Sequence, residues 1–216
     1  MQETYFLNKI VPLSLGGFCC IIICYFFLDI PVAQYFKYVN QTIYRISQDA
    51  TRTIDPKYHY LIWPCLLFLT YFFSKKNIAI YRYPLFLLVM SVPVTNCAIE
   101  ILKRLLGRAR PELLLEHQIY GFSFFATSNS YFSFPSGHAC TAGAIFGSLC
   151  CFFPRLTLLF FVFSIIVSFT RVVLNEHFVS DIIAGVLMGF FISQFIYSRI
   201  YTNKLKKRVL TTSDSH

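Results

Sequence analysis

Residues 10–28, IVPLSLGGFCCIIICYFFL, form an apolar run without a charged residue, bounded by Lys9 and Asp29. A transmembrane helix needs about 20 mostly apolar residues, so this run is long enough to cross a bilayer. A secretory signal peptide has a shorter apolar core, followed by a small-x-small cleavage site. Here the chain continues with LDIP at residues 28–31. We therefore predict an uncleaved first membrane helix.

The whole chain has the composition of a membrane protein. Of its 216 residues 56% are hydrophobic and 13% are charged, whereas soluble domains carry about 25% charged residues. So few charges could not cover a soluble surface, and a disordered chain would be poor in apolar residues. In a soluble protein a net charge of +9 would suggest nucleic-acid binding. In a membrane protein the positions of the charges relative to the spans must be considered first.

Five further apolar runs predict helical spans. They lie between residues 57 and 75, between 82 and 100, from 138 to before 155, from 156 to 174 and from 178 to 198. No internal repeat and no soluble second domain is apparent. The pattern predicts an all-α fold with six transmembrane helices, in a single membrane-embedded domain over residues 1–216.

Six spans would place both ends of the chain on one side of the membrane. That side then carries most of the net positive charge, and the other side is nearly neutral. Lys and Arg near span ends favour the cytoplasm, and the strongest signal is KLKKR at 204–208, within the tail 199–216. We predict cytoplasmic termini and a tail that anchors to lipid headgroups rather than to nucleic acid.

The cysteines give no sign of a metal or a disulfide. All eight fall inside predicted spans, and none has a spacing to His that is typical of zinc ligands. The adjacent pairs Cys19-Cys20 and Cys150-Cys151 are typical of small apolar packing residues. We expect no disulfide, no metal and no cofactor.

The segment 29–57 links the first two predicted spans. Its apolar residues recur at helical spacing, namely Val32, Phe36, Val39, Ile43 and Ile46. The pattern fits an interfacial helix or a surface loop with some helix.

Three polar clusters lie at the ends of the predicted spans. They are residues 103–111 (KRLLGRARP), 133–138 (SFPSGH) and 170–181 (TRVVLNEHFVSD). The topology derived from charge places all three on the face opposite the termini. Because ionisable groups near membrane spans are costly and often functional, we expect them to form one site.

The first cluster carries four cations, Lys103, Arg104, Arg108 and Arg110, before Pro111. Arg can hold two phosphate oxygens at once and Lys adds a point charge, so the cluster suits a polyanion. The alternative is an interfacial basic patch on anionic headgroups.

The second cluster opens the fourth predicted span. Gly137 allows close backbone approach, the first amides of a helix point at an anion, and Ser136 is a reasonable N-cap. The alternative is an ordinary turn before a helix. His138 is the unusual residue, since imidazole can give or take a proton near pH 7.

The third cluster holds His177 and Asp181, which share a helix face if the helix starts by residue 177. A carboxylate bonded to one ring nitrogen would leave the other free as a nucleophile. The alternative is a satisfied interfacial pair. Arg171 would add a phosphate ligand or extend toward the interface.

In this order the three clusters resemble the type 2 phosphatidic acid phosphatase family, which shares its site plan with vanadium haloperoxidases. The family pattern is Lys, six residues, Arg-Pro; then Pro-Ser-Gly-His; then Ser-Arg, five residues, His, three residues, Asp. The matching positions are Lys103, Arg110 and Pro111, then 135–138, then Arg171, His177 and Asp181. Thr170 stands where the family has Ser, which leaves its part in phosphate binding in doubt.

The resemblance implies a metal-independent, two-step phosphatase. His177 would attack phosphorus and form a phosphohistidine, and Asp181 would orient it. His138 would protonate the leaving group and then activate water. The resemblance also implies a set of ligands for the phosphoryl oxygens: Lys103, Arg110, Ser136, Gly137 and Arg171.

The substrate implied is a membrane lipid phosphate: phosphatidate, phosphatidylglycerol phosphate, a polyprenyl diphosphate such as undecaprenyl diphosphate, or lipid A. The loop 117–134 is rich in aromatic residues, which settle at headgroup level either as a belt or as substrate contacts. The residues in and around the motifs resemble those of bacterial sequences. We therefore expect an inner-membrane protein whose site faces the periplasm or exterior.

Several alternatives stay open at this point. The same phosphohistidine serves hydrolysis or transfer to a second lipid. A transporter or scramblase is disfavoured because the polar groups lie at span ends, not at mid-membrane, and a haloperoxidase is disfavoured by the membrane setting. The sequence leaves the oligomeric state open, and also the roles of Arg104, Arg108, Glu112, Glu116 and Glu176, of which the first four are candidates for headgroup selection.

Overall fold

A computed structural model describes residues 2–52, 65, 68–72 and 79–213. Over these residues the chain is helical, with no strand beyond an isolated pairing of Arg108 with Phe122. The helices are α1 (Gln2–Ile23), α2 (Asp29–Phe36), α3 (Gln41–Arg52), α5 (Ala79–Leu106), α6 (Pro111–His117), α7 (Gly137–Phe152), α8 (Thr157–Val173) and α9 (Val179–Ser213). The predicted all-α fold is confirmed.

Four helical stretches in the described part are long and apolar enough to cross a membrane: Pro12–Phe36, Leu85–Leu106, Pro154–Val173 and Val179–Ile200. They correspond to the first, third, fifth and sixth predicted spans. The fourth predicted span is the shorter apolar helix α7. The second, at 57–75, lies mostly outside the described residues, so the count of six stays a prediction.

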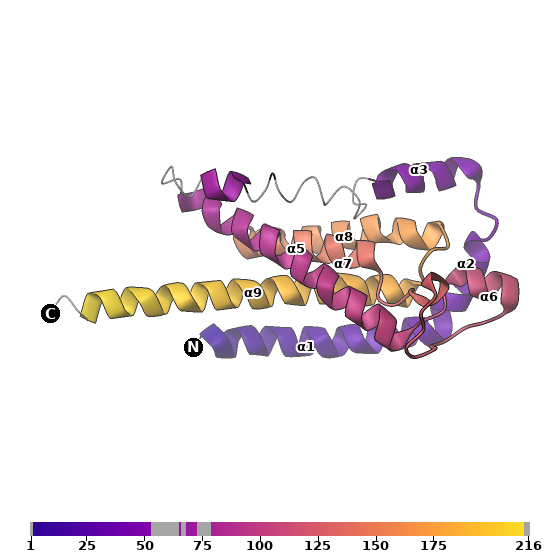
Figure 1. Cartoon of the computed structure of the whole chain (residues 1–216), viewed down its shortest axis with the longest axis horizontal. Coiled ribbons are helices and arrows are strands. Elements are labelled where there is room, and N and C mark those ends of the chain that lie inside the picture. The colour runs from indigo at the N-terminus through magenta and orange to yellow at the C-terminus, as the bar shows by residue number, and fades with distance from the viewer. Residues whose placement is uncertain (1, 53–64, 66–67, 73–78, 214–216) are drawn as a thin grey trace.

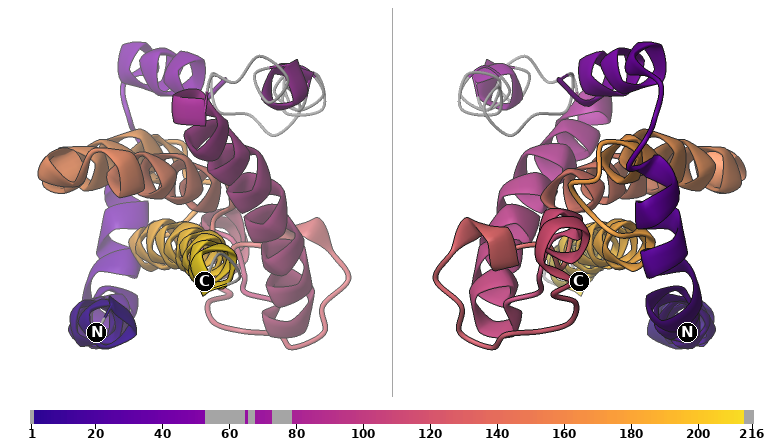
Figure 2. Two further views of the ribbon diagram at one scale, coloured as in Figure 1. Left: turned by 90° about the vertical axis from the view of Figure 1, so that its left-hand side faces the viewer. Right: turned by 90° about the vertical axis from the view of Figure 1, so that its right-hand side faces the viewer.

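Helices α7 and α9 pack closely through glycine at the centre of the bundle. A Cβ added at Gly143 would lie 2.2 Å from the carbonyl oxygen of Val186, and one at Gly189 would lie 2.1 Å from that of Cys140. Small residues let membrane helices approach closely, because lipid supplies little hydrophobic drive for association. Figure 2 shows α9 near the middle of the bundle, between α1 and α5.

Residues 29–52, the described part of the 29–57 segment, form two helices instead of one. A π-helical turn, Cys24–Leu28, joins α1 to α2, so α2 continues the first span. The Asn40 side chain then accepts the Thr42 N–H at 2.8 Å and caps the start of α3, which separates the two helices. In α3, Ser47 and Thr51 are buried, whereas Ile43 and Ile46 are exposed.

The two ends of the bundle differ. The start of α1 and the end of α9 lie at one end, and α2, α6 and the loop before α7 lie at the other (Figure 1). The basic tail is thus separated by the length of the bundle from the loops that carry the polar clusters. The clusters and the described ends of the chain thus lie at opposite ends of the bundle, and their placement on opposite sides of a membrane stays a prediction.

Candidate active site

The first cluster leaves helix α5 at Gly107. Its φ of +57° is left-handed, and a Cβ there would lie 1.8 Å from the carbonyl oxygen of Ser123, so only glycine fits. Backbone hydrogen bonds then hold residues 107–110 between two parts of the 117–134 loop: Ser123 N to Gly107 O at 2.7 Å, Ala109 N to Gly121 O at 3.0 Å, Arg110 N to Ser130 O at 2.9 Å and Ser133 N to Arg108 O at 3.1 Å.

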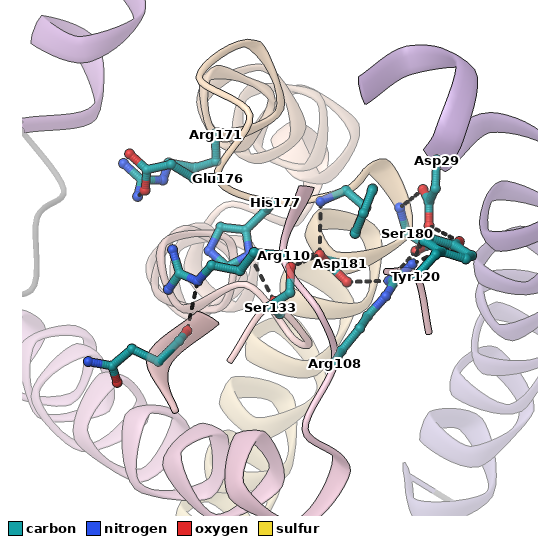
Figure 3. Close-up of polar contacts among 12 residues, drawn as sticks. Asp29, Arg108, Arg110, Tyr120, Ser133, Arg171, Glu176, His177, Ser180 and Asp181 are labelled. Atoms are coloured by element: carbon teal, nitrogen blue, oxygen red, sulfur yellow. Dashed lines mark hydrogen bonds and ion pairs between the residues drawn. The ribbon is translucent and has the colours of Figure 1, made fainter. Parts of the chain in front are cut away.

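Lys103 and Arg110 approach the other two clusters. The Lys103 ammonium lies 3.4 Å from where a Gly137 Cβ would stand, so it packs against the first turn of α7. It also pairs with Glu100 at 3.7 Å. Arg110 donates its Nε–H to the Asn129 carbonyl at 3.1 Å, and Figure 3 shows it beside His177. Two cations therefore converge near the histidine and the amides of α7.

Ser136 is the N-cap residue of α7, as expected, but its side chain makes no capping hydrogen bond. Its backbone N–H donates to the carbonyl of Asp181 at 3.2 Å, which joins the second and third clusters. The Ser136 hydroxyl is buried and has no hydrogen-bond partner among the described residues. This hydroxyl and the amides at the N-terminus of α7 are suited to oxyanion binding. His138 follows in the first turn of α7.

His177 is buried and lies just before α9, which begins at Val179. The condition for a shared helix face with Asp181, a helix start by residue 177, is therefore not met. Its Nδ1 lies 2.8 Å from the Ser133 carbonyl oxygen and 3.8 Å from the nearer Asp181 oxygen. The expected His–Asp hydrogen bond is thus replaced by a bond to the backbone (Figure 3). Because a carbonyl only accepts, Nδ1 carries the proton and Nε2 keeps its lone pair.

Asp181 reaches His177 indirectly. Its carboxylate accepts the Ser133 hydroxyl at 2.6 Å and the Phe178 N–H at 2.8 Å, and it pairs with Arg108. It therefore fixes Ser133, whose carbonyl fixes His177. Burial lowers the pKa of His177 to about 4 even though Asp181 opposes the shift, so the ring is neutral at pH 7.

Arg108 is fully buried, which rules out the headgroup-selecting role considered for it. It pairs with Asp181 and with Asp29 at 2.6 Å, and donates to the Ser180 hydroxyl at 2.7 Å and to Tyr120 at 3.1 Å. Burial alone would lower the pKa of Arg108, but the two carboxylates outweigh it and raise that pKa. Sequence reasoning used Asp29 only as the boundary of the first predicted span, although an ionisable group at the edge of a membrane span is a signal of function.

The aromatic residues of the 117–134 loop differ in burial. Phe122, Phe124 and Phe125 are exposed. Phe122 and two other rings of the loop, with two rings from outside it, surround the Arg108 guanidinium, whose carbon lies within cation–π distance of five ring centroids: Phe178 at 4.7 Å, Tyr25 at 4.8 Å, Phe122 at 5.5 Å, Tyr120 at 5.6 Å and Phe134 at 5.9 Å. These rings enclose a buried charge instead of forming a belt.

Arg171 forms an ion pair with Glu176, as Figure 3 shows. The neighbouring Thr170 hydroxyl donates to the Val167 carbonyl at 2.6 Å and lies 2.8 Å from the Thr51 hydroxyl. The Thr170 hydroxyl thus connects α8 to α3 and also bonds to the preceding turn of α8.

Three other charged residues of the site region, Arg104, Glu112 and Glu116, are exposed. Within the described residues, no group of three or more His, Cys, Asp or Glu side chains could hold a metal ion.

Two curated proteins share sequence with part of this chain. The lipid A 1-phosphatase of Rhizobium johnstonii (strain DSM 114642 / LMG 32736 / 3841) is 37% identical over 102 residues, which are 47% of this chain and 42% of that protein. The lipid A 1-phosphatase of Rhizobium etli (strain ATCC 51251 / DSM 11541 / JCM 21823 / NBRC 15573 / CFN 42) is 36% identical over 102 residues, 47% of this chain and 44% of that protein. The match thus spans less than half the length of either relative.

Two solved structures share the fold. The transmembrane PAP2 type phosphatidylglycerolphosphate phosphatase from Bacillus subtilis superposes with a TM-score of 0.60 over 88% of this chain and 96% of that one, at 17% identity. The structure of Aquifex aeolicus LpxE superposes with a TM-score of 0.55 over 80% of this chain and 95% of that one, at 19% identity.

A family model gives the assignment. The model described as PAP2 superfamily matches residues 84–205, which is more than half of the sequence and includes all three clusters. The chain therefore belongs to the PAP2 superfamily.

Proposed function

We propose that the protein is an integral-membrane lipid phosphatase that hydrolyses a phosphomonoester without a metal, through a phosphohistidine on His177. The observation that carries this proposal is the setting of His177. Its Nδ1–H is held by the Ser133 carbonyl at 2.8 Å, and burial lowers its pKa to about 4. A neutral imidazole with its Nε2 lone pair free is the form that can attack phosphorus.

In the first step Nε2 of His177 forms a bond to phosphorus while the bond from phosphorus to the lipid oxygen breaks. His138 gives its proton to that departing oxygen. In the second step His138 takes a proton from water, the water oxygen bonds to phosphorus, and the bond to His177 breaks. Inorganic phosphate leaves and both histidines return to their starting forms.

The ligands proposed for the phosphoryl oxygens are Lys103, Arg110, Arg171, the Ser136 hydroxyl and the amide of Gly137. Lys103 and Arg110 supply the positive charge that a metal ion supplies in other phosphoryl-transfer enzymes. The buried Ser136 hydroxyl, which has no partner in the described part of the chain, supports this assignment. Asp181 stabilises the charge that develops on His177, at 3.8 Å from its Nδ1.

We propose a lipid A phosphomonoester of the 1-phosphate kind as the substrate, because the curated relatives are lipid A 1-phosphatases. The cluster end of the bundle would face the periplasm of a bacterial inner membrane. The basic residues 204–208 would hold the far end of α9 in the cytoplasm.

The test is phosphate release by the purified protein in detergent with EDTA, over lipid A, phosphatidate, phosphatidylglycerol phosphate and undecaprenyl diphosphate. We expect release from lipid A, none from the His177→Ala variant, and normal release from His117→Ala, whose histidine is exposed on α6. Activity that EDTA removes and magnesium restores would contradict the metal-free mechanism. Labelled phosphate that moves to a lipid acceptor instead of water would assign a phosphotransferase.

A further inference from the structure

Asp29 is a buried carboxylate at the end of the first membrane helix. It is 1% exposed and lies outside residues 84–205, the part matched by the family model. The π-helical turn Cys24–Leu28 comes directly before it, and the Asp29 N–H closes that turn on the Cys24 carbonyl. Such π-bulges often occur at functional sites. Here the wider turn sets the direction in which the Asp29 side chain extends from the helix.

The Asp29 side chain makes contacts on two sides. It accepts the Ser180 N–H at 2.9 Å and the Ser180 hydroxyl, so it sits at the positive N-terminal end of α9. It also pairs with Arg108 at 2.6 Å. Figure 3 shows Asp29, Ser180, Tyr120 and Arg108 as one group, with Asp181 between this group and His177.

Arg108 carries the connection from Asp29 to the third cluster. One of its terminal nitrogens binds Asp29, and the other binds Asp181 and Ser180. Because the guanidinium is planar and rigid, fixing one nitrogen fixes the direction of the other. Asp181 in turn accepts the Ser133 hydroxyl at 2.6 Å, and the Ser133 carbonyl lies 2.8 Å from Nδ1 of His177.

The arrangement is costly if its only purpose is to hold helices together. Two carboxylates and one guanidinium are removed from water, and buried ion pairs often stabilise no better than apolar residues of the same size. The Ser180 hydroxyl and the aromatic rings complete the surroundings of the charges. Among the described residues Arg108 Nε has no hydrogen-bond partner, but both terminal nitrogens are bonded. Such connected networks favour one geometry over its neighbours.

We propose that Asp29 is a positioning residue for the nucleophile: it holds Arg108, which holds Asp181 and, through Ser133, sets the position of His177. The first membrane helix thus contributes to the active site without touching the substrate. The inference rests on the proposed function, because it assigns Asp29 a part in phosphoryl transfer to His177.

The first experiment is a rapid-quench measurement of phosphoenzyme formation from labelled lipid A. Its amplitude counts the folded, competent sites, and its rate reports the transfer step. In Asp29→Asn we expect the rate to fall about 10- to 100-fold, since small misplacements of a reacting group cost that much, with KM within about twofold. The control is Asp49→Asn, an exposed acid-to-amide change on α3. A lower amplitude at an unchanged rate would show that Asp29 only supports folding, and would overturn the proposal.

The second experiment is a double-mutant cycle of Asp29→Asn and Arg108→Gln. Arg108→Gln alone leaves two buried carboxylates without their cation, so we expect a large loss of thermal stability. Adding Asp29→Asn removes one of those charges and should recover part of the lost thermal stability. The phosphorylation rate should stay at the Arg108→Gln level, because both residues act through Asp181. If the fold losses in rate of the two single variants multiplied in the double variant, Asp29 would act independently of Arg108, and the proposal would be overturned.

Ser180→Ala keeps the inference testable if Asp29→Asn does not fold. It removes the hydroxyl that bridges Arg108 and Asp29 and keeps both charges. We expect a rate several-fold lower at full amplitude, and an unchanged rate would contradict the inference. If the unsubstituted protein forms no phosphoenzyme, the proposed function itself fails. If it does form one and the variants match it, only the role of Asp29 fails.

Discussion

Nδ1 of His177 lies 2.8 Å from the carbonyl oxygen of Ser133, closer than the 3.8 Å that separates it from Asp181. A backbone carbonyl therefore sets the tautomer of the ring. The carboxylate acts one step away, through the Ser133 hydroxyl, which it accepts at 2.6 Å. Ser133 thus connects Asp181 to the proposed nucleophile.

Replacing Ser133 by Ala should lower turnover without removing the tautomer-setting bond. The carbonyl stays in the variant, but its link to Asp181 is lost. We expect kcat to fall about tenfold, equivalent to ~1.4 kcal/mol of barrier. The measurement is phosphate release per folded protein, with Ser123→Ala as the control because Ser123 is exposed in the same loop. Equal kcat values for both variants would show that the Ser133 hydroxyl has no part in the mechanism.

The pH dependence of stability should report the buried His177. Burial lowers its folded-state pKa from 6.5 to about 4; Lys103 from α5 and Arg110 add to this shift, and Asp181 from α9 opposes it. As pH falls below about 6.5 the unfolded chain takes up the proton first, so stability is lost between about pH 6.5 and pH 4 and is then constant.

Thermal unfolding in detergent at pH 7 and pH 5 checks this assignment. The unsubstituted protein should lose more thermal stability between these pH values than His177→Asn, which has no titrating ring. Parallel losses in the two proteins would mean that His177 titrates at its ordinary pKa.

Glu176→Gln should strengthen binding of inorganic phosphate. Glu176 pairs with Arg171, so a phosphate oxygen that binds Arg171 must compete with this carboxylate. A partly exposed ion pair contributes about 0.2–1 kcal/mol, so we expect the inhibition constant of phosphate to fall by a factor of about 1.4 to 5. Glu112→Gln, on exposed α6, is the control. An unchanged constant in Glu176→Gln would place Arg171 outside the phosphate site.

The α7–α9 contact predicts opposite effects for two glycine substitutions. A Cβ at Gly189 would lie 2.1 Å from the Cys140 carbonyl oxygen, whereas one at Gly16 would have nothing within 4 Å. We expect Gly189→Ala to cost about 1–3 kcal/mol of stability through overpacking. Gly16→Ala should be neutral or slightly stabilising, because alanine favours helix. Thermal unfolding in detergent measures both, and similar melting temperatures would contradict the close packing.

The sequence predicted the helical class and the proximity of the three polar clusters. An apolar run is a local feature of the sequence, and therefore the helices α1, α5, α7, α8 and α9 could be predicted from such runs. The approach of Lys103 to Gly137 followed from placing three clusters on one face. The sequence also suggested that the clusters and the termini lie at opposite ends, as Figure 1 shows.

The inner contacts could not be predicted, because they depend on three-dimensional packing. Nothing local shows that Arg108 turns inward while Arg110 lies beside His177 (Figure 3). The partner Asp29 lies 79 residues earlier in the chain, beyond the reach of helical or motif spacing. The start of α9 at Val179 moved His177 off the helix, so the four-residue spacing to Asp181 no longer implied a direct bond.

The most direct test of the account is to locate the phosphoryl group on the enzyme. Labelled lipid A is mixed with the unsubstituted protein in EDTA and quenched with alkali during the first turnover, because His138→Ala would also lack the group that protonates the leaving lipid oxygen. We predict an acid-labile, alkali-stable phosphoenzyme, mapped by mass spectrometry to His177 and absent from His177→Ala. Label on a serine or aspartate, or undiminished labelling of His177→Ala, would contradict the account.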